Sequence, residues 1–164
     1  MVARCFLSVI LALAAASSEA RDMKRMTIQE FFNSLSKDNL HLVDEFYDRN
    51  VQFQDPVGML QGSDRVKAYY ARMYKNVKSI RFDFTSETAQ GSDVMVAWTM
   101  HLSASSLNGG DPIAVDGVSH IRYDAKGEKV TFHRDYFDMG AFVYEHIPVL
   151  GWGVRTIRKQ MALH

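Results

Sequence analysis

Two aspartates stand on apolar strand faces, where carboxyl groups are unusual. Side chains alternate between the two faces of a strand, so Asp55 shares a face with Phe53, and Asp135 shares one with His133 and Phe137. Burial disfavours the charged form of a carboxyl group, which suits general acid–base work near neutral pH. We therefore take Asp55 and Asp135 as the candidate catalytic residues.

Each aspartate also has a structural interpretation. Asp55 precedes Pro56 at the end of a strand, where aspartates commonly accept hydrogen bonds from turn amides. Asp135 could pair with His133 or with a side chain on a neighbouring strand. The sequence leaves both interpretations open.

The elements that would position these residues follow from hydrophobic periodicity. Thr27 and Glu30 form the pattern of a capping box at the start of a first helix. Leu40 to Tyr47 predicts a second helix, and Ser63 is placed to cap a third. Alternating apolar residues predict strands at 51–55, 80–84, 94–102, 113–123 and 129–138.

Composition excludes several classes of function. The 164 residues have a formal net charge of zero, which argues against nucleic acid as a partner. No Cys/His cluster has zinc spacing, and no glycine-rich phosphate loop is present. We expect no metal site and no organic cofactor. Hydrophobic residues make up 47% of the chain, enough for a sizeable core.

The two ends of the chain differ from the centre. Residues 1–20 have the pattern of a signal peptide: Arg4, an apolar run, and small residues at Ser18 and Ala20. We expect a periplasmic or secreted protein if this signal is used, and a cytoplasmic one if translation starts at Met23 or Met26. Residues 152–164 predict a basic amphipathic tail, which would cap the sheet, join an oligomer or make weak contact with a membrane surface.

Two segments carry a resemblance to a known family. The segment Phe46–Gly58 resembles the part of ketosteroid isomerase that holds its general base, and His133–Asp138 resembles the last strand of limonene-epoxide hydrolase. With the order of elements, they are similar to the SnoaL-like branch of the nuclear transport factor two-like superfamily over residues 26–151. The resemblance implies an α+β fold, with a cone-shaped, mainly antiparallel sheet wrapped by N-terminal helices around an apolar pocket.

The residues at the family's catalytic positions are only partly retained. Asp55 matches the isomerase base, but Phe31 and Ser119 stand where the isomerase has its two oxyanion donors, so steroid isomerisation is not expected. Asp135 matches the hydrolase aspartate, whereas Phe53 and Asp55 replace the tyrosine and asparagine that hold water. The chain thus retains one catalytic aspartate from each of the two enzymes but the complete set of catalytic residues from neither.

Three functions remain open. The chain could be a cofactor-independent isomerase, hydrolase or cyclase acting on a hydrophobic small molecule through its two aspartates. It could instead be a binding protein for a lipid-like or terpenoid ligand, or a dimerisation module. Apolar residues on both strand faces predict a homodimer. The residues expected to contact a ligand are Phe31, Phe53, Tyr69, Trp98, Met100, Ser119, His133 and Phe137.

Overall fold

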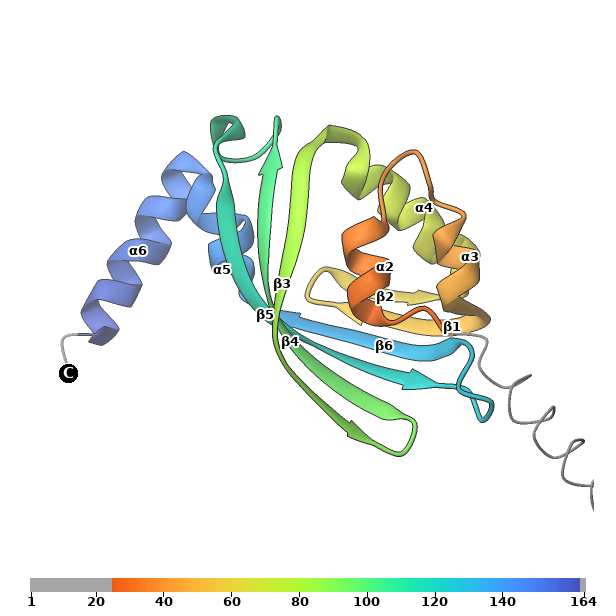
Figure 1. Cartoon of the computed structure of the whole chain (residues 1–164). Helices are drawn as coiled ribbons and strands as arrows, with labels where there is room; N and C mark the ends of the chain where they lie inside the picture. The colour runs from red at the N-terminus through yellow and green to blue at the C-terminus, as the bar shows by residue number, and fades with distance from the viewer. Residues whose placement is uncertain (1–24, 163–164) are drawn as a thin grey trace, which may run out of the picture.

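A strongly bent sheet forms the framework of the protein. The structure, a computed structural model, describes residues 25–162 (Figure 1). The sheet has six strands in the order β2-β1-β6-β5-β4-β3 and is mostly antiparallel. The strands are β1 (Tyr47–Asp55), β2 (Gly58–Gln61), β3 (Val77–Gln90), β4 (Asp93–Ala104), β5 (Ile113–Tyr123) and β6 (Val130–Phe137). The expected α+β fold is confirmed.

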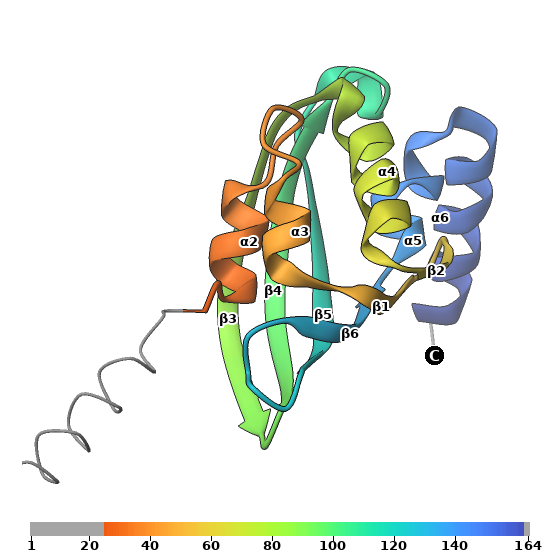
Figure 2. The same ribbon diagram turned by 90° about the vertical axis from the view of Figure 1, so that its right-hand side faces the viewer.

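Three helices lie in the inner angle of the bent sheet and two follow the last strand (Figures 1 and 2). The helices are α2 (Ile28–Ser34), α3 (Leu42–Phe46), α4 (Ser63–Met73), α5 (Met139–Phe142) and α6 (Pro148–Ala162), and the short 3-10 turns are η1 (Tyr74–Asn76), η2 (Asn108–Gly110) and η3 (Tyr144–His146). The predicted capping box begins α2: Thr27 Oγ1 accepts from the Glu30 amide at 3.2 Å, and Glu30 Oε2 accepts from the Thr27 amide at 2.9 Å.

The first and last strands pair in parallel, which brings distant parts of the sequence together. Phe53 lies opposite His133, and Gln54 lies opposite Arg134. Asp55 and Asp135 each follow one residue later on the same two strands. Neighbouring strands are about 4.8 Å apart, so the two aspartates lie close together on adjacent strands and point to the same face.

Aromatic side chains from α2 and α3 fill the space above the concave face. The rings of Phe31 and Phe46 stack with their centroids 4.3 Å apart, and both are buried. The ring of Phe32 contacts that of Phe82 on β3, with centroids 4.5 Å apart. This packing holds the helices against the sheet because each aromatic pair adds stabilisation beyond its buried area.

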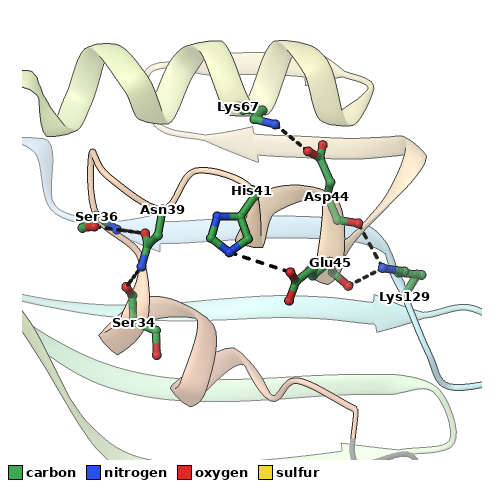
Figure 3. Close-up of polar contacts among 8 residues, drawn as sticks. All are labelled: Ser34, Ser36, Asn39, His41, Asp44, Glu45, Lys67 and Lys129. Carbon is green, nitrogen blue, oxygen red and sulfur yellow. Dashed lines mark hydrogen bonds and ion pairs between the residues drawn. The ribbon is translucent and has the colours of Figure 1, made fainter.

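Polar contacts hold the short helix α3 and the loop before it (Figure 3). Lys67 of α4 binds the Asp44 carboxylate at 2.5 Å, and Lys129 donates to the carbonyl groups of Asp44 and Glu45. In the preceding loop, Asn39 donates to the Ser34 carbonyl at 2.6 Å. The C-cap of α3 is Tyr47, a residue of the candidate site described below, so these contacts also position that site.

Several predicted boundaries differ from the structure. Tyr47, expected to end a helix, instead begins β1. The hairpin strand β2 was not predicted; it pairs with the end of β1 directly after Pro56. Ser63 is not a cap: the N-cap of α4 is Gly62, with φ of +91°, and no side chain caps the helix. Glycine favours this backbone conformation because it lacks a Cβ atom.

The C-terminal helix α6 begins earlier than expected and presents its cations differently. It starts at Pro148, so the predicted boundary at 151/152 falls within it. Arg158 pairs with Asp138 and Glu145, and Arg155 donates to the Glu145 carbonyl at 2.8 Å. Two cations of the expected basic tail, Arg155 and Arg158, therefore anchor the helix to the domain. In both views α6 lies at the opposite end of the molecule from α2 (Figures 1 and 2).

Within residues 25–162, no helix has the length and apolar character that crossing a membrane requires. The predicted signal peptide, residues 1–20, and the alternative start at Met23 lie outside the described residues.

Candidate functional site

Asp135 of β6 is held through one of its two carboxylate oxygens. Ser119 Oγ donates to Asp135 Oδ1 at 2.5 Å, and Nε2 of His133 lies 2.8 Å from the same oxygen. Among the described residues, no hydrogen bond reaches Oδ2. The Asp135 side chain is 11% exposed, so this second oxygen is available to a molecule from outside.

Ser119 is itself held by Trp98 of the neighbouring strand β4. The indole Nε1 donates to Ser119 Oγ at 2.9 Å. To reach Ser119, the indole ring lies across Gly117, the residue directly opposite Trp98 in the β4–β5 pairing. A Cβ atom at Gly117 would lie 2.2 Å from the ring, so only glycine leaves room for this arrangement.

His133 connects Asp135 to a buried pair of tyrosines. Its side chain is 0% exposed, and its Nδ1 lies 2.5 Å from the Tyr47 hydroxyl, which lies 3.3 Å from the Tyr70 hydroxyl. An ionised carboxylate only accepts, so we assign the proton to Nε2, and Nδ1 then accepts from Tyr47. Burial raises the pKa of both Tyr47 and Tyr70, so both phenols stay protonated and can act as donors.

Asp55 of β1 has both carboxylate oxygens occupied. Its Oδ1 accepts from the amides of Val57 at 2.8 Å and Gly58 at 3.0 Å, in the turn between β1 and β2. Its Oδ2 accepts from the Tyr69 hydroxyl. Burial, followed by this hydrogen bond to Asp55, raises the pKa of Tyr69. One oxygen of Asp55 therefore binds turn amides, as the structural interpretation expected, and the other accepts a hydrogen bond from Tyr69.

Both aspartates line one small cavity of about 80 Å³ between the helices and the concave face of the sheet. Five residues predicted to contact a ligand line it with them: Phe53, Tyr69, Trp98, Met100 and Phe137. Seven further lining residues were not predicted from the sequence: Phe32, Tyr70, Met73, Tyr74, Ile80, Phe82 and Phe142.

Some of these seven could have been found from the sequence. Tyr70 and Met73 lie on the apolar stripe of the third predicted helix, and Ile80 and Phe82 share one face of a predicted strand. The position of Phe142 depends on how the chain turns after β6, for which the sequence has no local signal.

Three predicted ligand contacts lie behind the cavity wall. Phe31 is fully buried against Phe46, and its neighbour Phe32 lines the cavity instead. Ser119 and His133 are also fully buried, and each acts on the cavity through its hydrogen bond to Asp135.

Tyr74, the C-cap of α4, is a polar lining residue that was not predicted from the sequence. Burial raises its pKa, so the phenol stays protonated. No hydrogen bond from another described residue reaches its hydroxyl group. Across residues 25–162, no three His, Cys, Asp or Glu side chains group so that they could hold a metal ion.

Comparison with protein families gives a match to the SnoaL-like domain over residues 28–133. The chain belongs to this family. The SnoaL-like match spans most of the described fold, from the start of α2 to His133 in β6. A comparison with curated proteins finds no match.

Solved structures share the fold of this SnoaL-like domain. A protein from Shewanella denitrificans OS-217, described as a SnoaL-like polyketide cyclase, has a TM-score of 0.60 and 19% identity, covering 68% of this chain and 88% of its own. A ketosteroid isomerase-like protein from Catenulispora acidiphila DSM 44928, in complex with trimethylamine, has a TM-score of 0.58 and 16% identity, covering 71% and 84%. TerC, crystallised with polyporic acid, has a TM-score of 0.51 and 21% identity, covering 58% and 76%.

Proposed function

We propose that this SnoaL-like domain is an enzyme that transfers a proton on a hydrophobic small molecule. One observation carries the proposal: Asp135 has a carboxylate oxygen that no other described residue binds, on the wall of an apolar cavity. A buried carboxylate that served structure alone would have both oxygens satisfied, as Asp55 has.

The surroundings of Asp135 suit a general base. His133 and Ser119 hold Oδ1 and fix the direction of Oδ2. In the proposed reaction Oδ2 removes a proton from a carbon atom next to a carbonyl group and returns it to another carbon. The protonated phenol of Tyr74 lines the same cavity and would stabilise the negative charge that develops on the carbonyl oxygen.

Asp55 has a different role in this proposal. Its carboxylate receives three hydrogen bonds, so it is less suited than Asp135 to take a proton from a ligand. We assign it the task of positioning Tyr69 at the cavity wall. Of the three reaction types, isomerisation and cyclisation need only proton transfer. Hydrolysis also needs a bound water molecule. At the two positions where the hydrolase holds its water, this chain has Phe53, which is apolar, and Asp55, whose oxygens already accept hydrogen bonds.

The descriptions of two solved structures with this fold support a small organic ligand. The Shewanella denitrificans protein is described as a polyketide cyclase, and TerC was crystallised with polyporic acid. The cavity wall of the present chain is rich in aromatic side chains, which suits a flat, apolar substrate. The proposed reaction draws on side chains alone.

The proposal can be tested before the substrate is known. Asp135→Asn keeps an oxygen for Ser119 and His133 but lacks the base, so it should retain substrate during purification. Native mass spectrometry would detect the bound compound, and adding that compound to wild-type protein should convert it. Asp116→Asn, on an exposed aspartate hydrogen-bonded to Thr99, is the matched control and should convert it too.

A binding protein is the second candidate, and the full hydrogen bonding of Asp55 favours it. Because both oxygens of Asp55 accept hydrogen bonds, Oδ2 of Asp135 is the one carboxylate oxygen in the described cavity wall that could take part in a reaction. If wild-type and Asp135→Asn proteins both retain the same compound and neither converts it, the domain is a carrier. If neither retains any compound, a dimerisation module becomes the better description of the domain.

A further inference from the structure

A second hollow adjoins the cavity and opens toward solvent. It has a volume of about 390 Å³ and lies between the β1–β2 hairpin and the C-terminal half of α4. We call it the outer groove. It shares four wall residues with the cavity: Phe53, Asp55, Tyr69 and Met73. Both views place β2 and α4 side by side (Figures 1 and 2).

The two spaces together set the shape of a ligand. Ligand pockets commonly measure about 300–1,000 Å³, and the inner cavity alone is well below that range. A molecule whose reactive part reaches Asp135 must therefore continue past Tyr69 and Met73 into the outer groove. That groove is walled by exposed apolar side chains: Met59 is 71% exposed, Val57 60% and Met73 40%.

Arg72 is the one cation that lines the outer groove. Its side chain is exposed, and within the described part of the chain its guanidinium group forms no hydrogen bond or ion pair. The only acid in the groove wall is Asp55, whose oxygens are occupied by Val57, Gly58 and Tyr69. The groove thus combines apolar walls with a guanidinium group that no described carboxylate binds directly.

We propose that the ligand of this domain is an amphipathic molecule whose apolar body lies in the outer groove and whose anionic group, such as a carboxylate, pairs with Arg72. A guanidinium group binds carboxylates through two parallel hydrogen bonds, which selects for an anion of this shape. The proposal rests on the proposed function for the position of the reactive part, whereas its test measures binding alone.

Two fluorescent probes separate charge recognition from apolar burial. 8-Anilino-1-naphthalenesulfonate carries a sulfonate, and N-phenyl-1-naphthylamine has the same rings without it. Arg72→Gln should weaken binding of the sulfonate probe about tenfold or more, as expected for the loss of a charge-assisted hydrogen bond, and leave the neutral probe within about twofold. Arg72→Lys should restore part of the affinity because it restores the charge.

Two control variants locate the probe. Arg65→Gln removes an exposed cation from the same helix outside the groove, and Lys159→Gln removes one from α6, where Trp152 and Met161 are exposed. Both should bind the sulfonate probe as wild type does. Loss of affinity in Lys159→Gln would place the probe on α6 and overturn the proposal.

Other results would also contradict it. A cation near the C-terminal end of a helix stabilises that helix, so Arg72 could serve α4 alone. In that case Arg72→Gln would lower the thermal midpoint and leave the affinity for the sulfonate probe unchanged. Absence of saturable binding of that probe would equally overturn the proposal. The probe titrations use no substrate and require no turnover, so a failed conversion assay and a failed binding assay are distinguishable.

Discussion

At the scale of single residues, Asp55 and Asp135 differ in what their second oxygen contacts. In Asp55 it accepts from Tyr69, whereas in Asp135 it meets the cavity. The difference arises from Tyr69 of α4, which donates to Oδ2 of Asp55, whereas the partners of Asp135, Ser119 and His133, both contact its Oδ1. Two nearby carboxylates on one face thus differ in their hydrogen bonding because their neighbours differ.

The hydroxyl group of Tyr47 is hydrogen-bonded to His133, and its removal should destabilise the protein. Tyr47→Phe leaves Nδ1 of a fully buried histidine without its donor, so we expect a loss of about 1–3 kcal/mol in the free energy of unfolding. Tyr123→Phe is the matched control, because Tyr123 is also buried and no hydrogen bond from a described residue reaches its hydroxyl. Urea denaturation checks both variants. Equal stability of the two would show that the Tyr47–His133 contact contributes nothing.

At the scale of elements, the β4–β5 pairing determines how Trp98 reaches the site. Gly117→Ala would place a methyl group 2.2 Å from the indole ring, which cannot shift without losing its hydrogen bond to Ser119. We expect a loss of about 1–3 kcal/mol in the free energy of unfolding, as for other overpacked cores.

Gly58→Ala provides the control for this substitution. A Cβ atom at Gly58 meets no atom within 4 Å, and the φ angle of Gly58 is not in the left-handed region. The free energy of unfolding of Gly58→Ala should therefore stay within about 0.5 kcal/mol of wild type. Chemical denaturation of both variants checks the prediction. If Gly117→Ala proves as stable as Gly58→Ala, the glycine is not needed for the position of Trp98.

Strand alternation was enough to predict which faces Asp55 and Asp135 occupy, because the period of two is a local property of the chain. It could not predict the partners of Asp135. The contact between Asp135 and Ser119 depends on the β5–β6 register. The contact between His133 and Tyr47 depends on the parallel β1–β6 pairing, which joins residues about 80 positions apart. Local sequence carries no information on such a pairing.

Element ends were predicted less well where tertiary contacts decide them. Gly58–Gln61 has no clear strand pattern, and it forms β2 by pairing with the edge of β1. The helix α6 continues through Gly151 and Gly153, which favour a break, because Gly151 packs against Glu145: a Cβ there would lie 2.2 Å from its carbonyl oxygen. The close approach of η3 and α6 requires this glycine.

At the scale of the whole molecule, the outer face of the sheet is the surface through which we predict a homodimer. Met95 on this face is 41% exposed, and Ala97 lies two residues further along the same strand. Met95→Glu should dissociate the dimer, because two-fold symmetry brings equivalent charges close together. Met161→Glu on α6, which is also exposed, is the control and should remain dimeric. Light scattering showing only monomer in the wild type, or dissociation by Met161→Glu alone, would refute this interface.

The proposed activity requires Asp135 to take a proton from carbon, and deuterium exchange measures this step directly. The compound retained by Asp135→Asn is incubated in D₂O with wild-type protein, with Asp135→Asn and with Asp116→Asn, and carbon-bound deuterium is measured by mass spectrometry. We predict that wild type and Asp116→Asn incorporate deuterium at similar rates and that Asp135→Asn is slower by about 100-fold or more. Incorporation at the wild-type rate by Asp135→Asn would contradict the assignment of Asp135 as the base.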